Sequence, residues 1–161
     1  MTRVFLMVVA LVCLCVLGCG GNNTVGASDY VPVTKFDPSR DAAKDIADAV
    51  AEAKRSGRQV LLDVGGEWCI WCHKLDEFLE TNPDVAELLH ANYVTVKVNF
   101  SPENKNEAVL SRYPKIRGYP HFFVLDDTGA VLHSQSTGDL EEGDHHDRDK
   151  VMAFLREWAP R

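Results

Sequence analysis

The sequence predicts an α/β domain built around a central mixed β-sheet with helices on both faces. Segments with apolar residues at helical spacing alternate with short apolar or β-branched runs that are typical of strands. Toward the end, two strand-like runs flank a tight turn, which predicts an antiparallel hairpin beside strands that are otherwise joined through helices. The chain has 161 residues, enough for one such domain with its own core.

The first predicted elements are a helix and a buried strand. Within 37–57 the apolar residues recur on one helix face. Asp37 or Ser39 can cap the start of this helix, and Gly57 can end it. Gln59–Gly65 is a short apolar run, which indicates a strand buried on both faces.

Further helices and a second strand follow a pair of cysteines. One helical pattern runs from the cysteines to Glu80, and another covers 82–91, where Pro83 suits the first turn. Residues 93–100 alternate and are β-branched, so they predict a strand. A helix is expected over about 103–113.

The end of the chain predicts a hairpin and a closing helix. Residues 121–135 indicate two strands around a turn at 127–129. Residues 147–158 form an amphipathic pattern that predicts the final helix. The residue pattern of 30–36 does not decide whether this segment adds one more strand to the sheet.

Composition and charge exclude one class of partner. The content of 45% hydrophobic and 25% charged residues is ordinary for a globular protein. The formal charge is −7 and no basic patch stands out, so nucleic acid is not an expected partner. Nothing in the sequence indicates oligomerisation, and we expect a monomer.

The N-terminus predicts export. Arg3 precedes an apolar run over 4–17 that is short for a membrane span but suits a secretory signal, which we assign to 1–18. The run closes in Val-Leu-Gly-Cys, which resembles a bacterial lipoprotein box and implies that Cys19 carries a lipid anchor. Residues 19–36 would then be the tether and 37–161 the domain, held at a membrane and facing the periplasm or cell exterior. The alternative is cleavage near 25–27, giving a soluble secreted protein.

The cysteine count singles out one pair. Of the five cysteines, Cys13 and Cys15 lie in the predicted signal and Cys19 at the predicted anchor, which leaves Cys69 and Cys72 in a CxxC motif. Cys69 stands where a strand ends and a helix begins, and the unpaired N–H groups and dipole of the helix start favour a thiolate there. Cys72 lies nearly one turn later, so its sulfur can reach back to close a reversible disulfide.

Two longer motifs resemble the thioredoxin family. "VLLDVGGEWCIWCHK" is similar to the family's strand-loop-helix segment, with an Asp six residues before the first cysteine. "YPKIRGYPHFFVL" is similar to its second signature, which carries a cis proline before a strand. "DDTGAV" and "STG" fall where the family has a hairpin turn and a later glycine. The resemblance covers about 37–158 and implies a thioredoxin-like fold.

The resemblance also implies roles for the motif residues, with no cofactor and no metal. Cys69 would be the attacking thiolate, Cys72 the resolving thiol, and Asp63 a buried carboxyl that passes the resolving thiol's proton. The implied substrate-binding residues are Trp68, Trp71, Tyr119 and Pro120, with a cis peptide before the proline. The alternatives are an exposed strand-end Asp63, a trans Pro120 at a strand start and a Trp68 that serves only in the core.

Several positions depart from the family pattern. Ile70 and Trp71 stand between the cysteines where most thioredoxins have Gly-Pro, so the resemblance leaves both directions of electron flow open. The motif resembles a looser thioredoxin-like branch, many of whose members are exported. Gly65 and Gly66 replace bulkier residues and are expected to open one side of the site. His73 either stabilises the Cys69 thiolate when charged or is a surface residue.

The resemblance predicts a thiol–disulfide oxidoreductase, with a reductase favoured over an oxidase. Its partners would be protein disulfides and a membrane thiol donor or oxidant. The alternative is a copper- or zinc-binding metallochaperone module, whose ligands would come from soft sulfur and imidazole groups. Those candidate ligands are Cys69, Cys72, His73, His145 and His146. A purely structural scaffold is the third hypothesis, and a reactive thiol pair argues against it.

Overall fold

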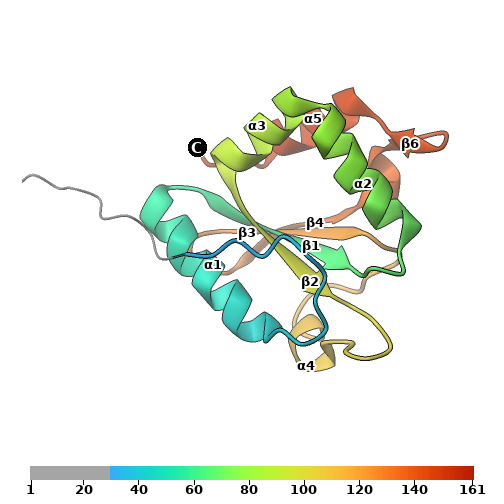
Figure 1. Ribbon diagram of the computed structural model, residues 1–161. Coiled ribbons are helices and arrows are strands. Elements are labelled where there is room, and N and C mark those ends of the chain that lie inside the picture. Colours follow the sequence, from blue (N-terminus) through green and yellow to red (C-terminus); the bar gives the residue numbers. More distant parts are fainter. Residues whose placement is uncertain (1–29) are drawn as a thin grey trace, which may run out of the picture.

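A computed structural model describes residues 30–161 (Figure 1). The predicted signal at 1–18, Cys19, the alternative cleavage region at 25–27 and most of the predicted tether lie outside the described residues, so the export and anchoring hypotheses stay predictions. Among the residues described, no helix combines the length and apolar character that a bilayer crossing requires.

The core of the fold is a four-stranded mixed sheet, as the sequence predicts. Its strands are β1 (Gln59–Gly65), β2 (Tyr93–Asn99), β3 (His121–Leu125) and β4 (Val131–Ser136), in the order β2-β1-β3-β4. β1 and β2 are parallel, while β3 runs antiparallel to both β1 and β4. The parallel pair is joined through two helices and the antiparallel pair β3–β4 through a tight turn.

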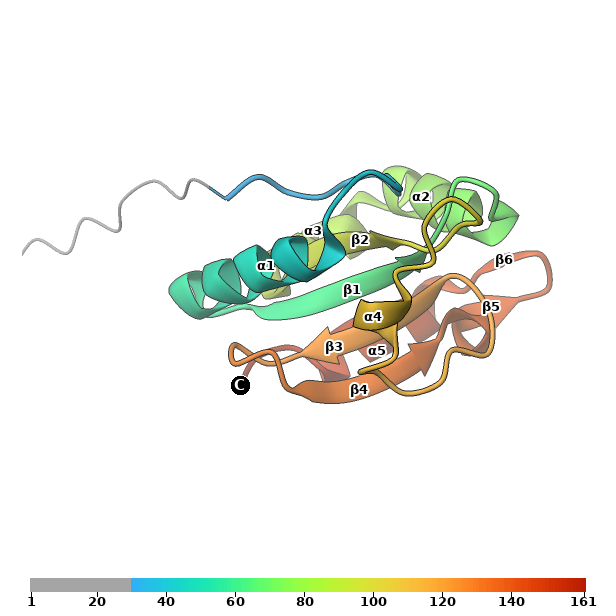
Figure 2. The same cartoon turned by 90° about the horizontal axis from the view of Figure 1, so that it is seen from below.

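Helices cover both faces of this sheet (Figures 1 and 2). On one face α1 (Ala42–Ser56) packs on alternate β1 residues such as Val60 and Leu62. On the other face Leu61 packs with residues of three helices. These helices are α2 (Ile70–Thr81), α3 (Pro83–Asn92) and α5 (Arg148–Glu157). Because side chains alternate along a strand, Asp63 shares the face of Leu61 and therefore lies on the side of α2.

The first helix begins later than the sequence predicts. Asp41 is the N-cap, and its carboxylate accepts a hydrogen bond from Lys44 N at 3.1 Å. Asp37 does not cap the helix, because its carboxylate accepts hydrogen bonds from the backbone and hydroxyl of Ser39. Gly57 ends the helix in the left-handed conformation with φ 69°, as expected.

The segment before α1 packs on the domain. Val33 forms a single parallel bridge with Val96, and Lys97 N donates to Val33 O at 3.0 Å. Val33 and Phe36 are buried. Residues 30–36 therefore add one bridge at the β2 edge but no full strand, and the folded domain begins before residue 37.

The helix expected over 103–113 is wrong in extent. Only α4 (Glu107–Leu110) is helical, one turn long. Asn106 at its N-cap has φ 47°, and hydrogen bonds of Asn104 and Asn106 to neighbouring backbone hold the preceding residues in a loop. Asn side chains favour such local bonds over helix, which the periodicity of the sequence does not reveal.

Two small elements precede α5 that the sequence analysis did not predict. A 3-10 turn, η1 (Thr137–Leu140), leads into a two-stranded hairpin made by β5 (Glu141–Glu142) and β6 (His145–His146). The strands contain charged residues and histidines, which carry little strand signal.

Candidate active site

Cys69 and Cys72 form a disulfide at the start of α2. Cys69 is the N-cap of the helix, and its sulfur accepts a hydrogen bond from Cys72 N at 3.1 Å. Both residues are buried, with exposed fractions of 4% and 0%. The helix start directs its unpaired N–H groups and positive dipole end at Cys69, which stabilises a thiolate on this sulfur once the disulfide is reduced.

Gly65, at the end of β1, lets the strand approach Cys72 closely. A Cβ on Gly65 would lie 2.5 Å from Cys72 Sγ and 3.0 Å from Phe36 Cζ. A Cβ on Gly66 would lie 2.4 Å from Trp68 Nε1. The expectation that these glycines open one side of the site is therefore wrong: other groups fill the space that larger side chains would take.

Asp63 lies behind the disulfide. Asp63 and Gly65 point to the same face of β1, and Cys72 Sγ occupies the space where a side chain of residue 65 would stand. Asp63 and Cys72 therefore lie on the same side of β1, at neighbouring positions along that face. Asp63 is 4% exposed, so the buried alternative holds and the exposed one is wrong.

Burial raises the pKa of Asp63 to about 6, against a weaker opposing effect of Lys97. Lys97 Nζ lies 3.5 Å from Asp63 Oδ2 but 2.6 Å from Asp76 Oδ1, so the ammonium is bonded more closely to the outer carboxylate. Asp63 Oδ1 has no hydrogen-bond partner among the described residues. A carboxyl in this state can take up and release a proton near neutral pH.

Sequence reasoning missed three groups around Asp63: Lys97, Asp76 and Phe36. The Lys97 ammonium lies 4.2 Å from the centre of the Phe36 ring, so two carboxylates and one aromatic face surround it. A lysine within the β-branched run of β2 was the available signal, since Lys97 stands opposite Asp63 in the register of β1 and β2. Nothing in the local pattern of Phe36 or Asp76 indicates these contacts.

Next to the cysteines lies an aromatic corner, defined by Trp68, Phe100 and Tyr119. Trp68 Nε1 donates to Phe100 O at 2.6 Å, and its ring meets Tyr119 edge-on at 5.5 Å. Tyr119 in turn stacks on Phe100 at 4.8 Å. Trp68 is 55% exposed, so it is not only a core residue and presents an aromatic surface beside the disulfide.

The Tyr119–Pro120 peptide bond is cis, as the motif predicts. Pro120 is buried directly before β3, and its carbonyl accepts a hydrogen bond from Thr137 Oγ1 at 2.6 Å. Tyr119 packs against the cluster formed by Phe36 and the two cysteines. The loop that carries the cis bond thus lies against the disulfide.

The residues between and after the cysteines have different surroundings. Ile70 is 68% exposed, whereas Trp71 is half-buried and meets the ring of His146. His73 is exposed, and its Nε2 hydrogen-bonds to Glu67 O at 2.8 Å. His73 is therefore a surface residue bonded to the loop before Cys69, as the second of the two hypotheses for this residue predicts.

The metal alternative finds no support in the arrangement of its candidate ligands. Within residues 30–161, no group of three or more His, Cys, Asp or Glu side chains could hold a metal ion. The cysteines are bonded to each other, His145 is exposed and His146 is buried among aromatic rings.

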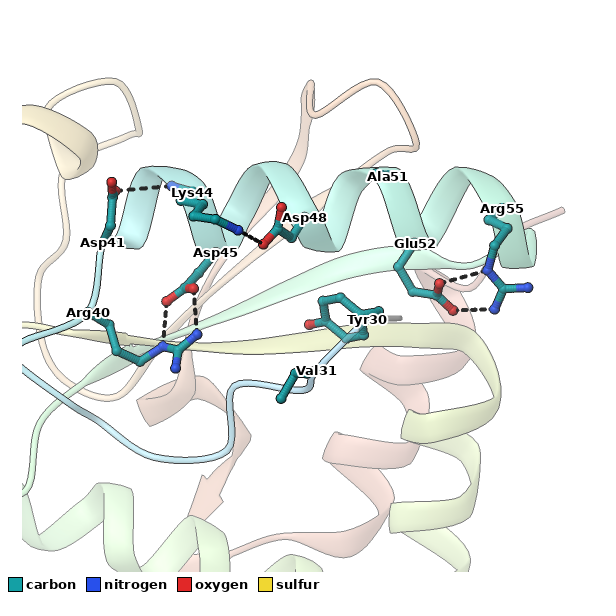
Figure 3. A pocket seen from close by; sticks show the side chains of 10 residues that line it. All are labelled: Tyr30, Val31, Arg40, Asp41, Lys44, Asp45, Asp48, Ala51, Glu52 and Arg55. Carbon is teal, nitrogen blue, oxygen red and sulfur yellow. Dashed lines mark hydrogen bonds and ion pairs between the residues drawn. The ribbon is translucent and has the colours of Figure 1, made fainter. Parts of the chain in front are cut away.

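Two surface cavities differ in their relation to the site. One, of about 920 Å³, lies between α1 and the segment at Tyr30 and Val31 (Figure 3). Most of its charged groups are engaged in ion pairs, including Lys44 with Asp48 and Arg55 with Glu52, and neither cysteine lines it. The other, of about 600 Å³, is lined by Asp63 together with Asp76 and Lys97 and leads from this buried carboxyl to the surface.

Comparisons with known proteins agree with this geometry. A family model described as "Thioredoxin-like" matches residues 41–127. The thiol:disulfide interchange protein DsbD of Escherichia coli K12 is 28% identical over 110 residues, which cover 66% of this chain and 19% of that protein. The chain thus spans less than a fifth of the length of the curated relatives that it matches.

Solved structures share the fold. The disulphide isomerase from Xylella fastidiosa Temecula1 has a TM-score of 0.65 at 24% identity, covering 80% of this chain and 98% of that one. The oxidised C-terminal domain of DsbD from Neisseria meningitidis has a TM-score of 0.54 at 21% identity, covering 73% of this chain and 96% of that one.

Proposed function

The chain belongs to the thioredoxin-like family, and on this premise we propose that it is a thiol–disulfide oxidoreductase, favoured as a reductase, acting on protein disulfides outside the cytoplasm. The observation that carries the proposal is the Cys69–Cys72 disulfide at a helix start, with the buried carboxyl of Asp63 on the strand behind it. Likeness to proteins named for thiol:disulfide interchange supports the same chemistry.

The first half of the reaction belongs to Cys69. In the reduced protein its thiolate attacks one sulfur of a substrate disulfide, and the other substrate sulfur leaves as a thiolate. Cys69 and the substrate are then joined by a mixed disulfide. The helix start favours this step because it stabilises the thiolate before attack.

The second half belongs to Cys72 and Asp63. The Cys72 thiol gives its proton to the Asp63 carboxylate, through a bridging water, and the resulting thiolate attacks the Cys69 sulfur. The Cys69–Cys72 disulfide forms, and the substrate sulfur leaves with the electron pair, so the substrate gains two electrons and the protein loses two. The cavity lined by Asp63 and Asp76 gives the proton a route to solvent.

The rim of the disulfide supplies the docking surface. Trp68 and Trp71 flank Cys69 in the sequence and supply aromatic rings near it, and Tyr119 and Pro120 form the adjoining loop. A proline has no N–H, so the chain at Pro120 leaves room for a substrate backbone to pair beside the cysteines.

The location and the partners complete the proposal. Export by the 1–18 signal and lipidation of Cys19 would hold the domain at a membrane, as a monomer that faces the periplasm or cell exterior. A membrane thiol donor would return electrons to the disulfide, and an oxidant would take that place if the exchange runs in the opposite direction. The equilibrium of the cysteine pair with glutathione decides between these directions.

Insulin reduction in the presence of dithiothreitol tests the proposal. The purified domain is expected to accelerate insulin precipitation and Cys69→Ser to abolish the acceleration. In a separate reaction without dithiothreitol, Cys72→Ser with a reduced Cys69 should trap a mixed disulfide with insulin. Absence of acceleration by the wild-type protein contradicts the function, and stoichiometric copper on the same protein would favour the metal alternative. Separately, Cys19→Ser should move the full chain from the membrane to the soluble fraction, and an unchanged membrane pool contradicts the anchor.

A further inference from the structure

The β5–β6 hairpin packs beside the start of α2 (Figures 1 and 2). It lies between η1 and α5, and Gly143 makes its turn with φ 63°. Its two histidines, His145 and His146, are candidate metal ligands by sequence alone. Its position next to the helix that carries the cysteines gives one of them a different role.

His146 fills the space between two aromatic rings of α2. Its ring meets Trp71 edge-on, with centres 5.7 Å apart and planes at 82°, and it lies 5.8 Å from the ring of Phe78. The residue is 2% exposed, and neither of its ring nitrogens has a hydrogen-bond partner among the described residues. Unpaired polar atoms in a buried ring lower stability, so the aromatic contacts are the favourable interactions at this position.

Lys74 makes a second connection between hairpin and helix. Its ammonium lies 4.4 Å from the centre of the Trp71 ring, and it donates a hydrogen bond to Asp144 O at 2.5 Å. Burial, together with the charges of Lys74 and His145, lowers the pKa of His146 to about 4. The His146 ring is thus neutral near neutral pH, and Trp71 is held from the hairpin side by both residues.

We propose that the β5–β6 hairpin braces the residue pair between the cysteines, with His146 as the positioning residue that fixes Trp71 and thereby favours the Cys69–Cys72 disulfide over the dithiol. The disulfide closes a short ring that restricts the backbone of Ile70 and Trp71 further, whereas in the dithiol only the hydrogen bonds of the first turn of α2 hold it. A contact that holds Trp71 in the restricted arrangement therefore stabilises the oxidised form more than the reduced form. The inference rests on the proposed redox cycle of this cysteine pair.

The equilibrium constant for oxidation of the pair by glutathione tests the brace, with the oxidised fraction measured by thiol alkylation. His146→Ala is expected to lower this constant by up to about tenfold, the limit set by the energy of a whole aromatic pair. His145→Ala is the matched control, because the His145 side chain lies on the same hairpin and is 67% exposed. The equilibrium constant of His145→Ala should equal that of the wild type. A His146→Ala constant equal to or above that of the wild type overturns the proposal.

A double substitution separates the brace from a general effect on the fold. Trp71→Ala removes the ring that His146 contacts, so His146→Ala should change the equilibrium constant little in the Trp71→Ala background. If the same fold-decrease appears with and without Trp71, His146 does not act through Trp71 and the inference is wrong.

Two replacements that keep the space filled cover the case in which His146→Ala does not fold. His146→Phe keeps an aromatic edge against Trp71 and should leave the constant near the wild-type value, whereas His146→Leu should lower it. Equal equilibrium constants for His146→Phe and His146→Leu contradict the proposal that an aromatic contact of residue 146 fixes Trp71. The glutathione equilibrium can be measured even if insulin is not reduced, so failure of the proposed function and failure of this inference are distinguishable.

Discussion

Asp63 and Lys97 stand opposite each other in the register of the parallel strands β1 and β2, with Lys97 Nζ 3.5 Å from Asp63 Oδ2. The ammonium is closer to Asp76, at 2.6 Å, so its attraction only partly offsets the burial of Asp63. The resulting pKa of about 6 leaves Asp63 ionised at neutral pH but readily protonated. This balance among three side chains is what the second half of the exchange requires, and it leads to the first three predictions.

Asp63→Asn should slow release of the mixed disulfide. Asparagine cannot accept the Cys72 proton, and positioned general bases contribute about a hundredfold or more. In the wild type this step should weaken as the pH falls through about 6, because Asp63 becomes protonated. Rapid-quench measurement of the mixed disulfide across pH checks both points. Asp63 is not the proton acceptor if the wild-type rate of mixed-disulfide release does not fall below about pH 6, or if this rate is unchanged in Asp63→Asn.

Asp63→Asn should also stabilise the oxidised protein above pH 7. The folded-state pKa is raised from 3.8 to about 6, so the folded protein binds the proton more tightly than the unfolded chain. Wild-type stability therefore falls as the pH rises from about 4 to about 6 and stays lower above that window. The difference corresponds to on the order of 3 kcal/mol. Denaturant unfolding of the wild type and of Asp63→Asn at pH 8 and pH 4 measures this difference. If Asp63→Asn raises the free energy of unfolding as much at pH 4 as at pH 8, the stability gain does not come from the pKa of Asp63.

Asp76→Asn should move the pH dependence of mixed-disulfide release to lower pH. Without the Asp76 carboxylate, the Lys97 ammonium can shift toward Asp63, and loss of the nearby negative charge acts in the same direction. Both effects lower the pKa of Asp63, by about one pH unit or more. Asp48→Asn is the control, since that exposed carboxylate pairs with Lys44 on α1. If the rate of mixed-disulfide release falls at the same pH in Asp76→Asn as in the wild type, Asp76 does not position Lys97.

Gly65→Ala should destabilise the oxidised protein. The new Cβ would lie 2.5 Å from Cys72 Sγ, and relieving such a clash costs about 1–3 kcal/mol. Gly118→Ala is the matched control, because no heavy atom lies within 4 Å of a Cβ there. Chemical denaturation of both oxidised variants gives the comparison. Equal stabilities of the two variants would mean that the contact between β1 and Cys72 is less tight than described.

The sequence by itself determined the elements whose signals are local. The apolar run of β1, the alternation in β2 and the turn between β3 and β4 follow from side-chain periodicity, and the mixed sheet follows from their order. The CxxC at a strand-to-helix junction was also readable from adjacent residues, whereas the cis peptide before Pro120 was implied by the resemblance to the thioredoxin family. Where local hydrogen bonds of Asn104 and Asn106 compete with the helix, the periodicity misled, and α4 is only one turn long.

Only the tertiary structure decided the surroundings of the cysteines. Phe36 comes from the segment before α1, Asp76 from α2, Lys97 from β2 and His146 from a late hairpin, and packing brings them together across long separations in sequence. The pKa of Asp63 depends on how deeply it is buried and on distances to Lys97 and Asp76. These quantities depend on packing in three dimensions, because desolvation and electrostatic attraction act through space and leave no periodic signal along the chain.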